Sequence, residues 1–223
     1  MRHWVTKLRE AIRGEKHRFQ HLGAEQKEKF EQKGLREFLL CGDCETKRSV
    51  WENHAKELME PGSPLVYKSL RSDVQKISGF DYPEFKLFQL STLWMAGISS
   101  LPFFSHVTLG VHEERIRDML FRSDPGEPYE YGCSMWATRL AGERSDLVVQ
   151  PGRVKKRLLN RVAYRFTFGG YKWIYFVSTL PPKTPEERVV FEQGGVLQKE
   201  GYFFVGTEDL ENEPSLRGLV RRL

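Results

Sequence analysis

The hydrophobic and polar positions follow a helical period in the first half of the chain. Residues 5–36 are rich in Lys, Arg, Glu and Gln and carry only a thin apolar stripe, which is typical of helices with one buried edge. Gly23 and Gly34 are the expected breaks between these helices, because glycine weakens a helix. We therefore predict a helical start to the chain.

Three more helices are predicted before residue 124. Residues 49–59 begin with Ser49 as a predicted N-cap and have Glu52 three residues later, which is the pattern of a capping box. Residues 81–101 carry large apolar side chains on most faces, and this predicts a helix that is buried on most sides. Residues 110–121 form the third helix, whose inward side chains are expected to be Ile116, Met119 and Leu120.

After residue 129 the period changes to the alternation of a β-sheet. Residues 161–178 contain two alternating runs joined by Gly169-Gly170, which predicts a hairpin with a two-residue turn. Residues 145–150 and 201–206 are predicted strands, and Gly194-Gly195 is a predicted second hairpin turn. The expected cross-strand pairs of the first hairpin are Phe168 with Tyr171, Phe166 with Trp173, Tyr164 with Tyr175, and Val162 with Val177.

These elements predict an α+β fold. Residues 1–123 are expected to form a mainly helical region around a CxxC knuckle, and residues 124–223 an antiparallel β meander with hairpins. We expect the two regions to pack as one domain. The aromatic face of the hairpin at 161–178 is expected to be core, because aromatic rows on one face of a sheet usually pack against helices.

Composition narrows the class of protein. With 223 residues, 39% of them hydrophobic and 13% aromatic, the chain is expected to fold as a globular protein rather than stay disordered. Its apolar runs are too short to span a bilayer, and three cysteines do not make a secreted disulfide framework, so we expect a cytoplasmic protein with no membrane partner. The net charge of +5 permits contact with nucleic acid phosphates.

The motif with the most specific chemical meaning is the CxxC pair Cys41-Gly42-Asp43-Cys44. A CxxC pair supplies two of the four ligands of a structural zinc site. His17 and His21 are spaced i, i+4, so they share one face of a predicted helix and would complete a Cys2His2 set. We predict zinc bound by Cys41, Cys44, His17 and His21.

Other interpretations of the cysteines stay open. His54 follows Cys44 by ten residues and His3 lies near the start of the chain, so either is an alternative ligand. The pair is also compatible with a redox dithiol, although no strand-helix unit of the thioredoxin type precedes it, or with a knuckle that binds no metal. Cys133 is expected to be a small buried residue.

Three segments resemble a family of uncharacterised bacterial proteins, some of them described as HNH-endonuclease-like. These are "LREFLLCGDCETKRSVWENHA", "FKLFQLSTLWMAGISSLPFFSHVTLGVHEERIRDML" and "DPGEPYEYGC", which together span roughly residues 36–133. The resemblance implies a treble-clef zinc site in which an upstream cysteine pair and a Ser-His-hydrophobic-Pro segment precede the pair that matches Cys41 and Cys44. This chain has no cysteine upstream of Cys41, and Arg2-His3-Trp4 is the only segment that could be the tail of such an element, although it lacks the proline.

The resemblance implies a metal-dependent DNA nuclease, which is a hydrolase, or a degenerate derivative of one. In HNH nucleases a histidine acts as general base, and a divalent metal stabilises the negative charge that develops on the phosphate. Catalysis would therefore need a second metal besides structural zinc. DNA or RNA would be the partner, and Arg165 and Lys172 beside the hairpin are candidate nucleic-acid contacts. The alternative is a non-catalytic, partner-binding or regulatory subunit of a bacterial complex, for example in antiviral (phage) defence. Catalytic residues are not assigned.

Overall fold

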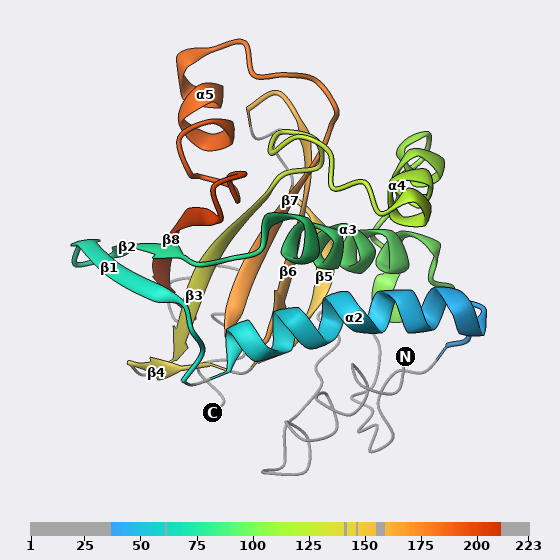
Figure 1. The fold of residues 1–223 in the computed structure, drawn as a ribbon, viewed down its shortest axis with the longest axis horizontal. Helices are drawn as coiled ribbons and strands as arrows, with labels where there is room; N and C mark the ends of the chain where they lie inside the picture. Colours follow the sequence, from blue (N-terminus) through green and yellow to red (C-terminus); the bar gives the residue numbers. More distant parts are fainter. Residues whose placement is uncertain (1–36, 61, 141, 146, 155–158, 211–223) are drawn as a thin grey trace, which may run out of the picture.

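The computed structural model describes residues 37–60, 62–140, 142–145, 147–154 and 159–210 (Figure 1). The helices predicted within residues 5–36, together with His3, His17 and His21, lie outside the described residues. Among the described residues, no helix combines the length and the apolar character needed to cross a bilayer. The helical elements are α2 (Gly42–Met59), α3 (Tyr82–Ile98), the short 3-10 turn η1 (Pro102–Phe104), α4 (His112–Arg122) and α5 (Pro185–Phe191).

A single mixed sheet forms the centre of the fold. Its strand order is β1-β2-β8-β3-β7-β6-β5, with the short β4 paired to β3. All neighbouring strands are antiparallel except β3 and β8, which run parallel. The strands are β1 (Val66–Arg71), β2 (Val74–Ser78), β3 (Cys133–Leu140), β4 (Glu143–Arg144), β5 (Val149–Arg153), β6 (Val162–Phe168), β7 (Tyr171–Val177) and β8 (Tyr202–Asp209).

The combination of helices and sheet agrees with the predicted α+β class, but two details differ. The hairpin β1–β2 lies in the region that was predicted to be mainly helical. The sheet is also not a simple antiparallel meander, because β8 inserts between β2 and β3 and is parallel to β3. As a result, strands from both predicted regions share one sheet.

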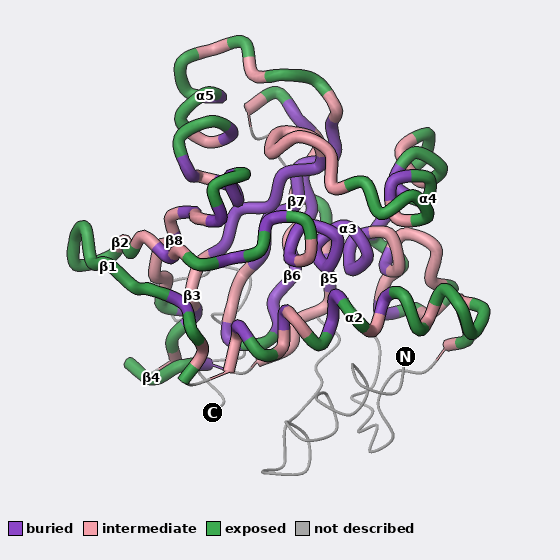
Figure 2. The backbone as a smooth tube through the Cα atoms, viewed as in Figure 1, coloured by how far each residue is buried: buried purple, intermediate pink, exposed green. Residues whose placement is uncertain are grey.

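The hairpin β6–β7 has the predicted register. Val162, Tyr164, Phe166 and Phe168 pair with Val177, Tyr175, Trp173 and Tyr171, respectively. Gly169 and Gly170 have φ angles of 61° and 79°, which is the conformation that a two-residue turn of this kind requires. Trp173 and Tyr175 are fully buried against the helices, so the aromatic face is core, as predicted. Figure 2 shows this buried centre of the sheet behind α3.

The first described helix begins earlier than predicted. α2 starts at Gly42 with Cys41 as its N-cap, rather than at Ser49. Asp43 and Glu45 in the first turn favour this start, because negative side chains stabilise the positive end of a helix. The predicted capping box is therefore wrong. Ser49 donates its hydroxyl to the Glu45 carbonyl within the helix, at 2.8 Å.

The next two helices are confirmed. Asp81 caps α3 by accepting a hydrogen bond from the Glu84 amide at 3.0 Å, and the helix ends at Ile98, slightly before the predicted end. α4 buries Ile116 and Met119 as expected, and it ends where Ser123 adopts a left-handed conformation with φ 54°. Most of α3 is buried, because it lies between the sheet and both α2 and α4.

Two predictions around the glycine and proline pairs are wrong. The strand predicted at 145–150 is instead β5, which starts at Val149 and runs through Pro151 and Gly152. Gly194-Gly195 does not turn a hairpin. α5 ends at Phe191 with Glu192 as its C-cap, and the glycine pair follows in a turn in which the Val196 amide donates to the Val190 carbonyl at 2.9 Å.

We predict that Gly201→Ala strongly destabilises the fold. Gly201 has φ 72°, its carbonyl accepts from the amides of Gly79 and Phe80, and an added Cβ would lie 2.2 Å from the Phe80 carbonyl oxygen. We expect a loss of about 2–4 kcal/mol in the free energy of unfolding, measured by chemical denaturation. Gly110→Ala is the matched control, because it has φ 56° but open space around its Cβ, so it should lose only about 1 kcal/mol. Equal losses would contradict the backbone clash.

Candidate functional site

Both cysteines of the CxxC motif lie at the start of α2. Cys41 is the N-cap, with extended backbone angles, and Cys44 is in the first turn. Both thiols are exposed and neither forms a disulfide. The spacing therefore places two sulfur atoms side by side at the positive end of a helix, where their negative thiolate forms are stabilised.

The two thiols differ in acidity. The pKa of Cys41 is lowered, first by the nearby Cys44 backbone amide and next by a hydrogen bond that the Cys44 thiol donates to it. The pKa of Cys44 is raised, above all because its thiol proton is held by that same hydrogen bond to Cys41. Cys41 is therefore the sulfur that becomes a thiolate first, which suits either a metal ligand or a nucleophile.

Further ligands for these sulfurs are not found in the described part of the chain. No group of three or more His, Cys, Asp and Glu residues in the described ranges could hold a metal ion. His54 belongs to the same helix as Cys44, ten residues later, and a helix rises about 15 Å over that length. His54 therefore does not share a site with the cysteines. His17, His21 and His3 fall outside the described residues, so the predicted Cys2His2 set stays a prediction.

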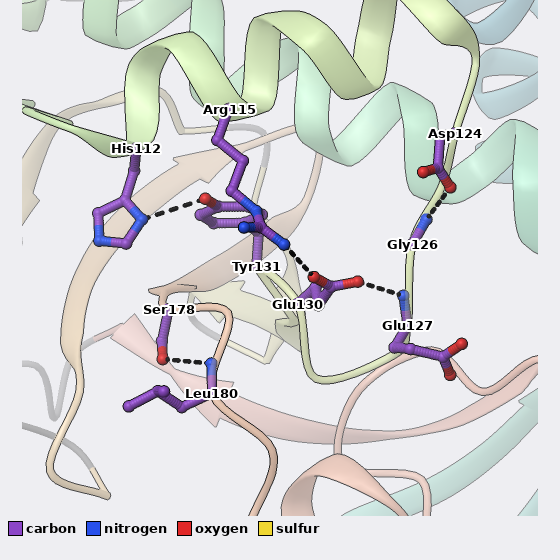
Figure 3. Close-up of polar contacts among 9 residues, drawn as sticks. All are labelled: His112, Arg115, Asp124, Gly126, Glu127, Glu130, Tyr131, Ser178 and Leu180. Carbon is purple, nitrogen blue, oxygen red and sulfur yellow. Dashed lines mark hydrogen bonds and ion pairs between the residues drawn. The ribbon is translucent and has the colours of Figure 1, made fainter.

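A second polar cluster surrounds Tyr131, below α4 (Figure 3). His112 Nδ1 lies 3.1 Å from the Tyr131 hydroxyl, and Arg115 donates to Glu130 at 3.0 Å. Burial and the nearby Arg115 lower the pKa of His112, so its ring is neutral at neutral pH. Glu130 also accepts from the Glu127 amide at 3.0 Å, which ties the loop after α4 to this cluster. These contacts position the loop after α4 against the start of that helix.

A fully buried lysine lies beneath the same loop. Lys86 of α3 is 1% exposed and donates to the Tyr131 carbonyl at 3.2 Å. Burial lowers its pKa to about 8, although Cys133 and Glu130 oppose the shift. Burial also raises the pKa of Cys133 well above the usual range of a thiol, so Cys133 stays neutral and acts as the small buried residue that was predicted.

Sequence reasoning missed Lys86. Its only signal is that a single lysine interrupts the apolar run Phe85-Lys86-Leu87-Phe88 in a helix with large side chains on most faces. A lysine at such a position is removed from water, and this disfavours its charged form and lowers its pKa.

The two predicted nucleic-acid contacts lie on the sheet face opposite to the aromatic core. Arg165 on β6 and Lys172 on β7 are both half-buried. Lys172 forms an ion pair with Glu208 and lies 5.3 Å from the centre of the Trp136 ring. Its charge is therefore already balanced by β8, and phosphate contact by Lys172 would have to compete with Glu208.

Comparisons with known proteins gave no match: no family model, no curated protein and no solved structure is similar to this chain. The resemblance to HNH-like proteins therefore stays a prediction, and function has to be argued from the geometry of the cysteine pair.

We predict that Cys41 is the fastest-reacting thiol of the metal-free protein. At pH 7, iodoacetamide followed by peptide mass spectrometry should label Cys41 first and leave Cys133 unlabelled until the protein unfolds, because only the thiolate reacts and Cys133 is buried and neutral. In Cys41→Ser, Cys44 should react no faster than an ordinary thiol. Equal labelling of Cys41 and Cys133 in the folded protein would refute this order.

The buried lysine predicts a pH dependence of stability. Its pKa falls from 10.5 to about 8 on folding, so between these values the unfolded chain binds more protons and stability rises with pH. Below about pH 8 the cost of protonating Lys86 is fully present. Lys86→Met should remove the slope between pH 8 and 10 and leave the protein at least as stable at pH 7.

The measurement is the difference in unfolding free energy between wild type and Lys86→Met at several pH values. Other lysines and tyrosines titrate in the same way in both proteins, so their effects cancel in this difference. A difference that does not change with pH would show that Lys86 is not desolvated.

Proposed function

We propose that the protein is a zinc-binding, nucleic-acid-associated protein related to HNH-type nucleases. The observation that carries the proposal is the placement of Cys41 and Cys44 on the first turn of α2, with both sulfurs exposed and Cys41 acidified by backbone amides. A helix that begins with two cysteines in this way presents half of a tetrahedral zinc site.

The zinc site needs two more ligands. His17 and His21 are the candidates, because the chain that carries them leads directly to Glu37 and the cysteines. Imidazole and thiolate together form a usual ligand set for structural zinc. Bound zinc would fix the chain before α2 against the helix start, and it would hold both cysteines as thiolates.

The nucleic-acid part of the proposal rests on the net charge of +5 and on the resemblance to HNH-like proteins. Contacts between basic side chains and phosphates release counterions, so affinity should fall as salt rises. Cleavage would further require a histidine base and a second divalent metal. The described residues contain no cluster of that kind, so we propose nucleic-acid association rather than catalysis as the present activity.

A second candidate function is supported by the edge strand β1. All six of its residues are exposed, and they include Val66, Tyr67 and Leu70, which are 62%, 51% and 47% exposed. An exposed edge with apolar side chains is a usual site for pairing with another chain. This favours the alternative of a partner-binding subunit without catalytic activity.

We predict one zinc ion per chain in the full-length protein, measured by elemental analysis. Cys41→Ser and Cys44→Ser should each abolish zinc binding, and His17→Ala and His21→Ala should weaken it. Cys133→Ala is the matched control and should keep its zinc, because Cys133 is fully buried in the core. The same zinc-loaded protein should retain single- or double-stranded DNA, with log affinity falling linearly as log salt rises.

Two results would decide against this proposal. Zinc content that is unchanged in Cys41→Ser would remove the cysteine site. Zinc binding without DNA or RNA retention at low salt would leave the partner-binding function of the β1 edge as the better explanation.

A further inference from the structure

A cavity of about 110 Å³ lies between α2, α3 and the β5–β6 edge of the sheet. Leu39 and Arg48, which flank the cysteine pair in the sequence, line this cavity, but neither cysteine does. The cavity is partly open to solvent and its walls are mostly apolar. Phe103 and Phe166 are buried parts of the wall, and Ala96 of α3 is another. Its lining residues come from segments far apart in the sequence, from Glu37 to Phe168, so no single motif marks this site.

One charged side chain reaches the cavity from α2. Arg48 lines the wall, is only 6% exposed, and lies one helical turn after Cys44. One end of its guanidinium pairs with the equally buried Glu52. Its Nε has no hydrogen-bond partner among the described residues. A buried donor without an acceptor costs free energy. A bound molecule that offers an acceptor oxygen to this N–H would remove that cost.

A carboxylate also lines the cavity. Glu37 is half-buried, directly before the fully exposed Phe38. It accepts hydrogen bonds from Ser99 at 2.5 Å and from the amide of Ser100 at 2.8 Å. Burial alone would raise its pKa, but these hydrogen bonds lower it, so Glu37 is an anion at neutral pH.

These charges exclude ionic ligands. Glu52 already neutralises Arg48, so a second anion would enter a site that also contains the Glu37 carboxylate, and it would lose its hydration without gaining a partner charge. An ammonium ion has no lone pair with which to accept from Arg48 Nε, so it would leave that buried donor unsatisfied. The ligand should therefore carry no net charge and should offer an acceptor to Arg48 Nε. An uncharged molecule with an apolar body and a carbonyl oxygen does both.

The size of the cavity sets the size of the ligand. An engineered apolar cavity of about 150 Å³ holds benzene, so about 110 Å³ with one open side accommodates most of a single six-membered ring. We propose that this cavity binds a small, uncharged lactam ring, the chemistry of a pyrimidine base, with its carbonyl on Arg48 Nε. This inference does not depend on zinc or on the nucleic-acid proposal, because a free ring suffices.

The test uses methyl NMR of the full-length protein labelled at the methionine methyl groups. Met95 lines the cavity, whereas Met119 on α4 does not and serves as the internal control. The probes are 2-pyridone, toluene and benzoate. We expect saturable shifts of the Met95 signal, with 2-pyridone binding about tenfold more tightly than toluene because of the hydrogen bond to a charged donor, and with benzoate weakest.

Two variants separate the polar contact from the apolar cavity. Arg48→Lys keeps a cation beside Glu52 but removes the Nε donor, so it should bring the affinity for 2-pyridone down to that for toluene. Ala96→Leu fills the cavity and should abolish both. Equal binding of toluene and 2-pyridone to wild type would overturn the polar contact, and tighter binding of benzoate would overturn the neutral ligand. No Met95 shift with any probe would overturn the site.

The source of the ring is tested with uracil and with a short oligothymidylate, using an abasic oligonucleotide as control. A Met95 shift with uracil alone identifies a free base or nucleoside as the ligand. A shift with oligothymidylate that the abasic strand does not cause identifies a base extruded from a strand. If neither shifts Met95, the assignment to pyrimidines is wrong.

Discussion

The packing of α3 on the aromatic face of β6–β7 is the interaction on which the rest of the structure depends. Phe85 lies with its ring centre 6.3 Å from that of Trp173 on β7 and 6.4 Å from that of Phe203 on β8. One helix side chain thus joins two strands that are not neighbours in the sheet. Because α2 in turn packs on α3, the position of the cysteine pair and of the cavity follows from this aromatic contact.

Burial of charge is the second constraint. Arg48 with Glu52, and Arg161 with Glu187 at 3.7 Å, are buried cation-carboxylate pairs. Lys86 instead donates to the Tyr131 backbone carbonyl, which does not neutralise its charge, so burial lowers its pKa. A buried pair adds little net stability, because desolvation offsets the attraction, but removing one partner is costly. These positions therefore restrict which substitutions the core tolerates.

Local patterns predicted local structure well. The register of β6–β7 followed from alternation and from Gly169-Gly170, and the buried helix predicted at 81–101 matches α3. The start of α2 was missed because Ser49 and Glu52 imitate a capping box, whereas Glu52 actually pairs with Arg48. The edge strand β1 was missed because all its residues are exposed, so it has no alternation to detect. For the candidate site, spacing alone singled out Cys41 and Cys44. The cavity is assembled from segments far apart in the sequence, so it left no pattern there.

The place of β8 in the sheet has a consequence for the order of folding during synthesis. Val74 of β2 pairs with Gly206 of β8, and Trp136 of β3 pairs with the same residue from the other side. The hairpin β1–β2 therefore has no neighbour to join until nearly the whole described chain has left the ribosome. Until then its exposed apolar edge is open to other nascent chains, because β8 has to be synthesised before the sheet can close around it.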